Sequence, residues 1–257
     1  MTNQEIWKIA LQQSAYDFGC APEDFVSGKN LVVRSRTDKR ARKYLPLPFA
    51  CDMVSYGSNI VAQTNEALEA IVLEYIETYA VSHAFETPNI HALEEKLRPF
   101  GLAVCFMAEY FLPDVEQMQL HDCDYALRVL QPADFAHLYT EEWSDALCKD
   151  RKELDVLAVG AYDGETLVGL AGCSADCEAM YQIGVNVLPA YRKQGIAAAV
   201  TAHLADEILK LGKVPFYCAA SCNIASVRNA IKCGFRPAWA ELTARETDFI
   251  KKMNARP

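Results

Sequence analysis

The stretch that decides the fold is residues 185–197, with the sequence VNVLPAYRKQGIA. It combines an apolar strand, a bend at Pro189, a basic turn that contains Gly195, and the start of an alanine-rich helix. The free N–H groups at a helix start, together with the helix dipole, favour an anion such as pyrophosphate. Gly195 lets the backbone approach oxygen atoms that a Cβ would block. The stretch therefore predicts a phosphate-binding loop, although an ordinary β-α connection would also explain these residues.

The residues around the glycine agree with a phosphate-binding loop. Small side chains at 197–199 keep the first helical turn open to a ligand and close to the sheet, and Arg192 and Lys193 add positive charge. Two rival phosphate motifs, G-x-G-x-x-G and G-x-x-x-x-G-K-[ST], do not occur in the sequence. Their absence argues against a nicotinamide-dependent dehydrogenase and a P-loop NTPase.

A second motif follows the loop at the distance expected for one known family. Residues 223–226 read NIAS and residues 232–235 read KCGF, at the start and end of a predicted short helix. With Arg192, Gly195 and Ala197 in the loop, these residues resemble the GNAT superfamily of acyl-CoA-dependent N-acetyltransferases. The resemblance covers roughly residues 125–242. The whole chain also resembles two-part bacterial GNAT proteins that carry an extra N-terminal domain.

The order of predicted elements gives the fold class. Asp163-Gly164 predicts a two-residue hairpin between two apolar strands. An antiparallel meander followed by β-α-β implies an α/β (α+β) fold with a mixed, mostly antiparallel GNAT-type sheet flanked by helices. The predicted strands of this part are 125–130, 156–162, 166–173, 179–187, 214–219 and 238–242, and the predicted helices are 132–139, 195–211 and 226–233.

The first part of the chain predicts a smaller α/β domain without a second phosphate loop. Its expected helices are 3–16, 65–79 and 90–97, and its expected strands are 31–34, 53–62 and 102–107. We divide the chain into an N-terminal domain, 1–122, and a GNAT domain, 123–257. The first domain is interpreted as a degenerate half-copy of the fold, a substrate-specificity domain or a homodimer interface. Because the last predicted strand stands alone, strand 102–107 is expected to complete or flank the C-terminal sheet.

The resemblance implies a division of labour in cofactor binding. Strands 179–187 and 214–219 should splay apart and leave a gap for the pantetheine arm of acetyl-CoA. Asn223 would hydrogen-bond this arm, and Ser226 would lie near the phosphates, although a helix cap is the alternative interpretation of both residues, with the helix starting at Ser226. The complete set of implied cofactor-binding residues is Val185, Asn186, Val187, Arg192, Lys193, Gln194, Gly195, Ile196, Ala197, Ala198, Asn223 and Ser226.

The catalytic groups are less defined by the sequence. Many superfamily members place a proton-donating tyrosine four residues after the Ser/Ala of the NIAS-type motif, where this chain has Ala230. Tyr217 is the substitute acid that we consider, against the alternative of core packing. Asp176 and Glu178 are candidate bases or amine-binding carboxylates, against the alternative of solvated hairpin acids. By resemblance, the backbone N–H of Val187 is the expected oxyanion donor.

Charge and composition limit the possible partners. The formal net charge of −9 argues against a nucleic-acid partner. One local exception is segment 34–43, which holds six basic residues and one acid; it predicts a solvated basic loop, or alternatively a docking site for an acidic partner or a CoA phosphate. Residues 1–12 carry no secretory apolar run, and the apolar stretch 101–107 is far shorter than the roughly 20 residues that span a bilayer. We therefore expect a cytoplasmic protein without a membrane partner.

The ten cysteines bear on the redox state of the protein and on metal binding. In a chain without an export signal they are expected to be reduced. Cys173 and Cys177, and likewise Cys218 and Cys222, are four residues apart, but no histidine lies nearby at a spacing that would complete a zinc site. No metal is expected.

The sequence thus predicts an acetyl-CoA-dependent N-acetyltransferase that acts on a primary amine of a small molecule or peptide. The main alternative is a catalytically weak acyl-CoA-binding regulatory module. A third reading is an acyltransferase that uses a longer acyl chain or an oxygen nucleophile.

Overall fold

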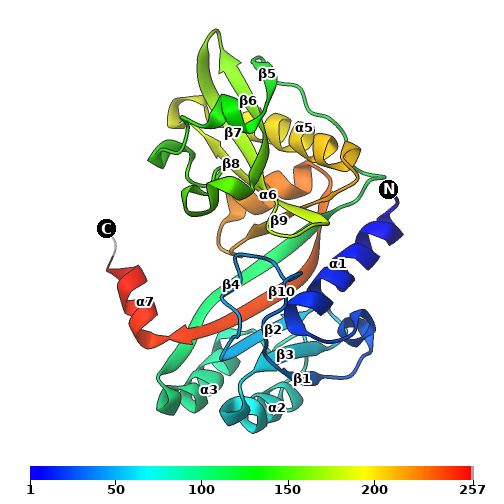
Figure 1. Cartoon of the computed structure of the whole chain (residues 1–257), viewed down its shortest axis with the longest axis vertical. Helices are drawn as coiled ribbons and strands as arrows, with labels where there is room; N and C mark the ends of the chain where they lie inside the picture. Colours follow the sequence, from blue (N-terminus) through cyan, green and yellow to red (C-terminus); the bar gives the residue numbers. More distant parts are fainter. Residues whose placement is uncertain (256–257) are drawn as a thin grey trace. The chain divides into compact units, whose positions relative to one another are not determined.

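The structure is a computed structural model that describes residues 1–255. Figure 1 shows the chain with its helices and strands labelled. The strands are β1 (Leu31–Arg34), β2 (Cys51–Ser55), β3 (Ile60–Thr64), β4 (Leu102–Pro113), β5 (Ala126–Leu130), β6 (Asp155–Asp163), β7 (Thr166–Ser174), β8 (Met180–Val187), β9 (Val214–Ala219) and β10 (Phe235–Glu246). The α-helices are α1 (Asn3–Phe18), α2 (Glu69–Thr78), α3 (Thr87–Leu97), α4 (Pro132–Phe135), α5 (Ile196–Lys210), α6 (Ile224–Lys232) and α7 (Thr247–Asn254).

The ten strands within residues 1–255 form a mixed, mostly antiparallel sheet flanked by helices, which confirms the predicted fold class. Parallel pairing joins β1 to β3 and β8 to β9. Antiparallel pairing joins β2 to β3, β2 to β10, and the meander from β5 to β8. Within residues 1–255, none of the helices has the length and apolarity needed to cross a bilayer.

The chain divides into two compact units, each built from two separate segments. Among the described residues, unit 1 contains 1–9 and 111–237, and unit 2 contains 10–110 and 238–255. The chain passes from one unit to the other inside α1, β4 and β10, not in linkers. The division into 1–122 and 123–257 stays a prediction about function, since the compact units interleave.

Unit 1 contains the strands in the order β4-β9-β8-β7-β6-β5. Helix α5 packs along β6, β7 and β8, as Figure 1 shows. Its buried residues include several alanines, such as Ala198, Ala202 and Ala205, which let the helix axis lie close to the sheet. The predicted hairpin between β6 and β7 is confirmed, with Gly164 at φ +59° in its turn.

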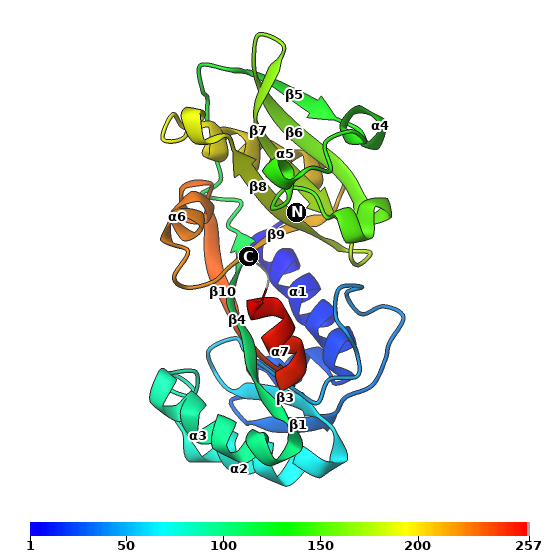
Figure 2. The same ribbon diagram turned by 90° about the vertical axis from the view of Figure 1, so that its left-hand side faces the viewer.

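Unit 2 contains the order β1-β3-β2-β10-β4. Figure 2 shows α2 and α3 on one side of these strands. That side buries apolar residues from alternate strand positions, for example Met53 on β2 and Leu242 on β10, against Val72 of α2 and Leu93 of α3. Strand β4 begins at Leu102 as predicted and lies beside β10, so the last strand does not stand alone.

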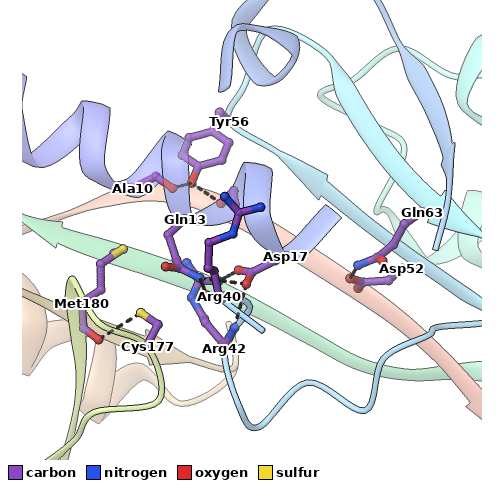
Figure 3. Close-up of polar contacts among 11 residues, drawn as sticks. Ala10, Gln13, Asp17, Arg40, Arg42, Asp52, Tyr56, Gln63, Cys177 and Met180 are labelled. Carbon is purple, nitrogen blue, oxygen red and sulfur yellow. Dashed lines mark hydrogen bonds and ion pairs between the residues drawn. The ribbon is translucent and has the colours of Figure 1, made fainter. Parts of the chain in front are cut away.

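The other side of the unit 2 strands carries buried polar groups, drawn in Figure 3. Asp52 accepts hydrogen bonds from Gln63 at 3.0 Å and from Thr243 at 2.9 Å. Nearby, Arg42 forms a buried ion pair with Asp17, at 3.0 Å between Nη1 and Oδ2. Arg42 belongs to the basic segment 34–43, so the prediction of a solvated loop is wrong for this residue.

Three local predictions need correction. The predicted strand 53–62 is a hairpin of β2 and β3, because the turn residues 57–59 interrupt it. The short helix begins at Ile224, two residues before the predicted Ser226. The last strand extends to Glu246 and continues into α7, which the sequence analysis missed.

Candidate active site

Strands β8 and β9 separate partway along their length. They are paired only from Met180 opposite Val214 to Ile183 opposite Tyr217. Beyond this point, residues 184–187 keep their partners on β7, whereas the pairing with β9 has ended. The β9-facing edge of β8 therefore carries backbone N–H and C=O groups that the sheet does not use. The predicted splay between these strands is confirmed.

A cavity of about 540 Å³, here called the loop cavity, lies at this opening. Eleven of the twelve residues predicted to bind the cofactor line it: Val185, Asn186, Val187, Arg192, Lys193, Gly195, Ile196, Ala197, Ala198, Asn223 and Ser226. Gln194 is the exception, and its side chain accepts a hydrogen bond from the hydroxyl of Tyr125 at 2.5 Å. The loop and the second motif, about thirty residues apart in the sequence, thus meet around one cavity.

The backbone of the loop has an unusual conformation. Gly195 has φ +83° and Lys193 has φ +64°, the single left-handed residue other than glycine within residues 1–255. Such a conformation is costly for a side-chain-bearing residue and is typical of functional loops. Helix α5 begins directly afterwards, and no side chain caps its first N–H groups. The conformation therefore leaves N–H groups at the helix start for an anion.

Glycine in the neighbouring strand positions this helix start. A Cβ at Gly169 of β7 would lie 2.3 Å from the Ile196 side chain, at the first residue of α5. The missing side chain allows Ile196 to pack directly on the sheet. The helix start is thereby held at the open end of the strands.

Four cations are among the residues that line the loop cavity. Arg192 and Lys193 come from the loop, and Arg228 and Lys232 come from one face of α6. The Nε of Arg192 donates to the carbonyl oxygen of Val187 at 3.2 Å, which fixes this side chain at the end of β8. Four cations around an uncapped helix start suit a ligand with several phosphates.

A second cavity of about 340 Å³ adjoins the loop cavity. The two share the lining residues Asp145, Val185, Tyr217, Asn223 and Ser226. The second cavity extends from these residues toward Ser174 on β7 and Asp155 on β6. The site therefore consists of two connected spaces that meet where β8 and β9 part.

Tyr217 lies at this junction. It is 2% exposed, and its hydroxyl lies 2.8 Å from Oγ of Ser226. Burial raises the pKa of Tyr217 above its ordinary value, so the phenol keeps its proton at neutral pH. A protonated hydroxyl between the two cavities is chemically suited to donate a proton.

Helix α6 explains the position of this hydroxyl. Asn223 caps the helix, since its Oδ1 accepts from the N–H of Ser226 at 3.2 Å. The interpretation as a helix cap is therefore confirmed for Asn223 and wrong for Ser226. Ala230, one turn later, is fully buried in the core of unit 1 and lines neither cavity. The hydroxyl of Tyr217, on β9, thus reaches the first turn of α6. Ala230 occupies the position where many superfamily members have a tyrosine, and its side chain packs in the core.

The wall of the second cavity is an irregular segment that crosses the sheet. A Cβ at Gly184 would lie 1.9 Å from the carbonyl oxygen of Asp145, and one at Gly172 would lie 2.3 Å from that of Ala146. Two strand glycines therefore make the close crossing possible. Trp143 and Leu147 anchor the same segment in a buried apolar cluster.

The two carboxylates predicted as bases lie outside both cavity linings. Asp176 is 1% exposed and forms an ion pair with Nε of Arg151 at 3.0 Å. Glu178 is exposed on the turn between β7 and β8. Their catalytic roles stay predictions.

Asp155 is the buried carboxylate that does line the second cavity. Its Oδ2 accepts from the N–H of Cys148 at 2.8 Å. Burial raises the pKa of Asp155 to about 6, against the stabilising hydrogen bond from Cys148. Within residues 1–255, no group of three or more His, Cys, Asp or Glu residues is arranged to hold a metal ion.

Sequence reasoning missed several of these lining residues. Arg228 and Lys232 carry a signal that was readable, because a spacing of four places both on one face of a predicted helix. Asp145 and Arg151 lie in irregular backbone, where no periodicity indicates which side chains face the sheet. Asp155 is the first residue of a strand. Only the register of that strand with β7 and β8 shows that Asp155 lies beside Ser174 and Gln182 in the second cavity.

Comparison with known proteins agrees with this architecture. The chain is a mixed α/β protein in which an uncapped helix start lies beside the point where two strands of the sheet part. The family model described as GNAT acetyltransferase matches residues 110–239, just over half of the chain. The chain belongs to the GNAT acetyltransferase family. None of the curated proteins searched matches it significantly.

Solved structures show more distant similarity. A GCN5-related N-acetyltransferase from Kribbella flavida is 16% identical, with a TM-score of 0.47, over 62% of this chain and 64% of its own. A GCN5-related N-acetyltransferase-like protein from Streptococcus suis is 19% identical, with a TM-score of 0.44, over 60% and 67%. The aminoglycoside N-acetyltransferase AAC(6')-Iy, solved with CoA, is 17% identical, with a TM-score of 0.36, over 47% and 93%. The chain spans slightly less than two thirds of three of the first four structures.

Proposed function

We propose that this protein transfers the acetyl group of acetyl-CoA to a primary amine of a small molecule or peptide by direct attack. The observation that carries the proposal is the pair of connected cavities, one with the cationic loop in its lining and one whose lining includes the carboxylates Asp145 and Asp155. The family membership supports acetyl transfer in general terms.

The residues of the loop cavity suit the cofactor. Acetyl-CoA supplies an activated thioester when bound. The N–H groups of the loop and of the α5 start, with Arg192, Lys193 and Arg228, would bind the phosphates. The unpaired edge of β8 at 185–187 would pair with the amides of the pantetheine arm, as an added strand does. Asn223 would add a side-chain hydrogen bond.

The second cavity would hold the acceptor amine. Its nitrogen would form a bond to the acetyl carbon while the carbon–sulfur bond breaks. Tyr217 is the proposed donor of the proton that the leaving thiolate takes up. The backbone N–H of Val187 is the proposed oxyanion donor. Asp176 or Glu178 would accept the amine proton through water.

A substitution in the loop tests cofactor binding. Gly195→Glu should abolish CoA binding measured by calorimetry, because the added carboxylate occupies and repels the phosphate site. Gly195→Ala is the finer variant, and Gly212→Ala is its matched control at the other end of α5, with φ +73° against +83°. Both alanines impose left-handed strain of about 1–2 kcal/mol, yet only Gly195→Ala should weaken the binding of CoA. Unchanged affinity in Gly195→Glu would refute the loop assignment.

The alternative is a catalytically weak regulator that binds acyl-CoA. The buried Ala230 favours it, because the usual tyrosine of the family is missing there. Release of free thiol with a panel of amines separates the two functions. Turnover supports the enzyme, whereas tight CoA binding without turnover supports the regulator. A cytoplasmic location and a homodimer formed through residues 1–122 stay proposals.

A further inference from the structure

The floor of the second cavity is a row of polar side chains on three adjacent strands. Asp155 of β6 lies opposite Ser174 of β7, which in turn lies opposite Gln182 of β8. Residues that are directly opposite share one face of a sheet. All three line the second cavity. The row therefore leads away from the junction of the cavities toward Asp155.

Ser174 indicates that this floor receives a ligand. The residue is only 8% exposed, and its Oγ is buried without a hydrogen-bond partner. A buried hydroxyl without a partner is unfavourable, because it has lost its hydrogen bonds to water and forms none within the protein. Because Ser174 lines the cavity, a ligand with N–H donors would satisfy it.

The charges of the second cavity favour a cation. Its acidic lining residues are Asp145 at the junction and Asp155 at the far end. Arg151 also lines the cavity, but its guanidinium is ion-paired with the buried Asp176. The positive charge of Arg151 is thus neutralised by Asp176, which lies outside the cavity lining. The two lining carboxylates therefore make the electrostatic potential in the second cavity negative.

The spacing of the carboxylates gives the size of the cation. Asp155 lies two strands away from β8, which is about 10 Å at the usual spacing of strands. Asp145 crosses directly over Gly184 of β8, at the junction. A ligand with two positive charges joined by a short flexible chain can contact both ends.

We propose that the acceptor is a compact diamine, whose reacting nitrogen lies beside Asp145 and Tyr217 and whose second ammonium binds Asp155 and Ser174. This inference rests on the proposed N-acetyltransferase function. The second ammonium donates to the Asp155 carboxylate and to Oγ of Ser174 and takes no part in bond making. It orients the chain so that the first nitrogen, once deprotonated, attacks the acetyl carbon.

Three acceptors of matched length test the proposal. They are 1,6-diaminohexane, hexylamine and 6-aminohexanoate, which carry a cation, a methyl group and an anion at the far end. We expect kcat/KM for the diamine to exceed that for hexylamine by about tenfold or more, the size of one well-placed charge pair. The carboxylate should be the poorest acceptor. Equal values for diamine and hexylamine, or a preference for the carboxylate, would overturn the proposal.

Variants locate the second ammonium. Asp155→Asn keeps an oxygen that can accept from Cys148 and removes the charge, so the ratio of kcat/KM for the diamine to that for hexylamine should fall toward one. Ser174→Ala should reduce the same advantage by a smaller factor, and it provides the test if Asp155→Asn fails to fold. Glu165→Gln, at the exposed β6–β7 hairpin, is the charge-matched control. An advantage that survives in both cavity variants contradicts the assignment.

A binding measurement separates this inference from the proposed function. The diamine is titrated calorimetrically into the CoA-saturated protein and into its Asp155→Asn variant. Binding that the variant loses supports the dication site even if no acetyl group is transferred, in which case the proposed function alone fails. Acetylation of other amines without binding of the diamine overturns the inference and leaves the function standing.

Discussion

The side chain of Asn186 holds the backbone of Asp145 in place. Its Oδ1 accepts from the N–H of Asp145 at 2.9 Å and from that of Ala146 at 2.8 Å, while its Nδ2 donates to the Asp145 carboxylate at 2.9 Å. One amide on β8 thus fixes the segment that forms a wall of the second cavity. The same residue also lines the loop cavity, so it contributes to the walls of both spaces.

The first prediction concerns this amide. Asn186→Ala removes the three hydrogen bonds and leaves the β8 backbone intact. We expect the KM for the amine to rise about tenfold, the equivalent of roughly one net hydrogen bond, with little change in the Kd for CoA. Steady-state kinetics and calorimetry measure the two. Asn186→Asp, which places a second carboxylate beside Asp145, should be worse for the amine. A larger loss of CoA affinity than of amine affinity would contradict this role.

The second prediction concerns Tyr217. Tyr217→Phe removes the proton donor but keeps the ring, so kcat should fall by about 10–100-fold, at the low end of general-acid effects because a thiolate leaves readily. The Kd for CoA should stay the same. Ser226→Ala removes the hydroxyl that contacts Tyr217 and should reduce kcat less. If Tyr217→Phe retains full kcat, the ring serves packing alone.

The third prediction concerns pH. The pKa of Asp155 is raised to about 6 by burial, with Cys148, Tyr139 and Arg151 favouring its charged form and Asp176 opposing it. The advantage of 1,6-diaminohexane over hexylamine should therefore be small at pH 5 and reach its full value above pH 7. Alkyl amines with pKa values near that of lysine stay protonated throughout, so the ratio of kcat/KM cancels their own titration. A flat ratio between pH 5 and 8 would exclude Asp155 as the binding group.

The fourth prediction concerns stability. Burial raises the pKa of Glu241 to about 7, despite the attraction of Arg42. Because the folded protein holds this proton more tightly than the unfolded chain, the stabilisation is complete below pH about 4.5 and is lost as the pH rises through 7. Glu241→Gln cannot ionise and should be more stable than the parent at pH 8, by about 2–3 kcal/mol, with no gain near pH 4.5.

Denaturant unfolding at several pH values measures this difference. Glu246→Gln is the control on the same strand, since its side chain is exposed beside Arg245. It should show no gain that depends on pH. An equal gain at pH 4.5 and pH 8 for Glu241→Gln would assign the effect to packing and not to the charge.

Local chemistry made much of the fold predictable. The Asp163-Gly164 turn, the apolar strands and Gly195 at the helix start each follow from the conformations that these residues allow. The cofactor-side cavity could be anticipated for the same reason, because its residues belong to two short continuous motifs.

The rest depends on contacts that are not local. The acceptor-side wall at 143–147 has no periodic pattern, and it crosses the sheet only because glycines 172 and 184 lie beneath it. The carboxylate at Asp155 joins Ser174 through strand register, which no short stretch encodes. Helix α7 was missed because it has only eight residues, none of them buried, although its apolar residues do follow a helical period.

The pairing of β2 with β10 has a consequence for biosynthesis. Ser55 and Ala240 are partners although 185 positions separate them. At ribosomal rates of roughly 5–20 residues per second, β2 waits on the order of ten seconds or more for its partner. During that interval one edge of a strand that is buried in the native protein is unpaired and open to strands of other nascent chains. Unit 2 can therefore be completed only after translation has passed residue 246, so the yield of native protein should depend on chaperones that shield this edge.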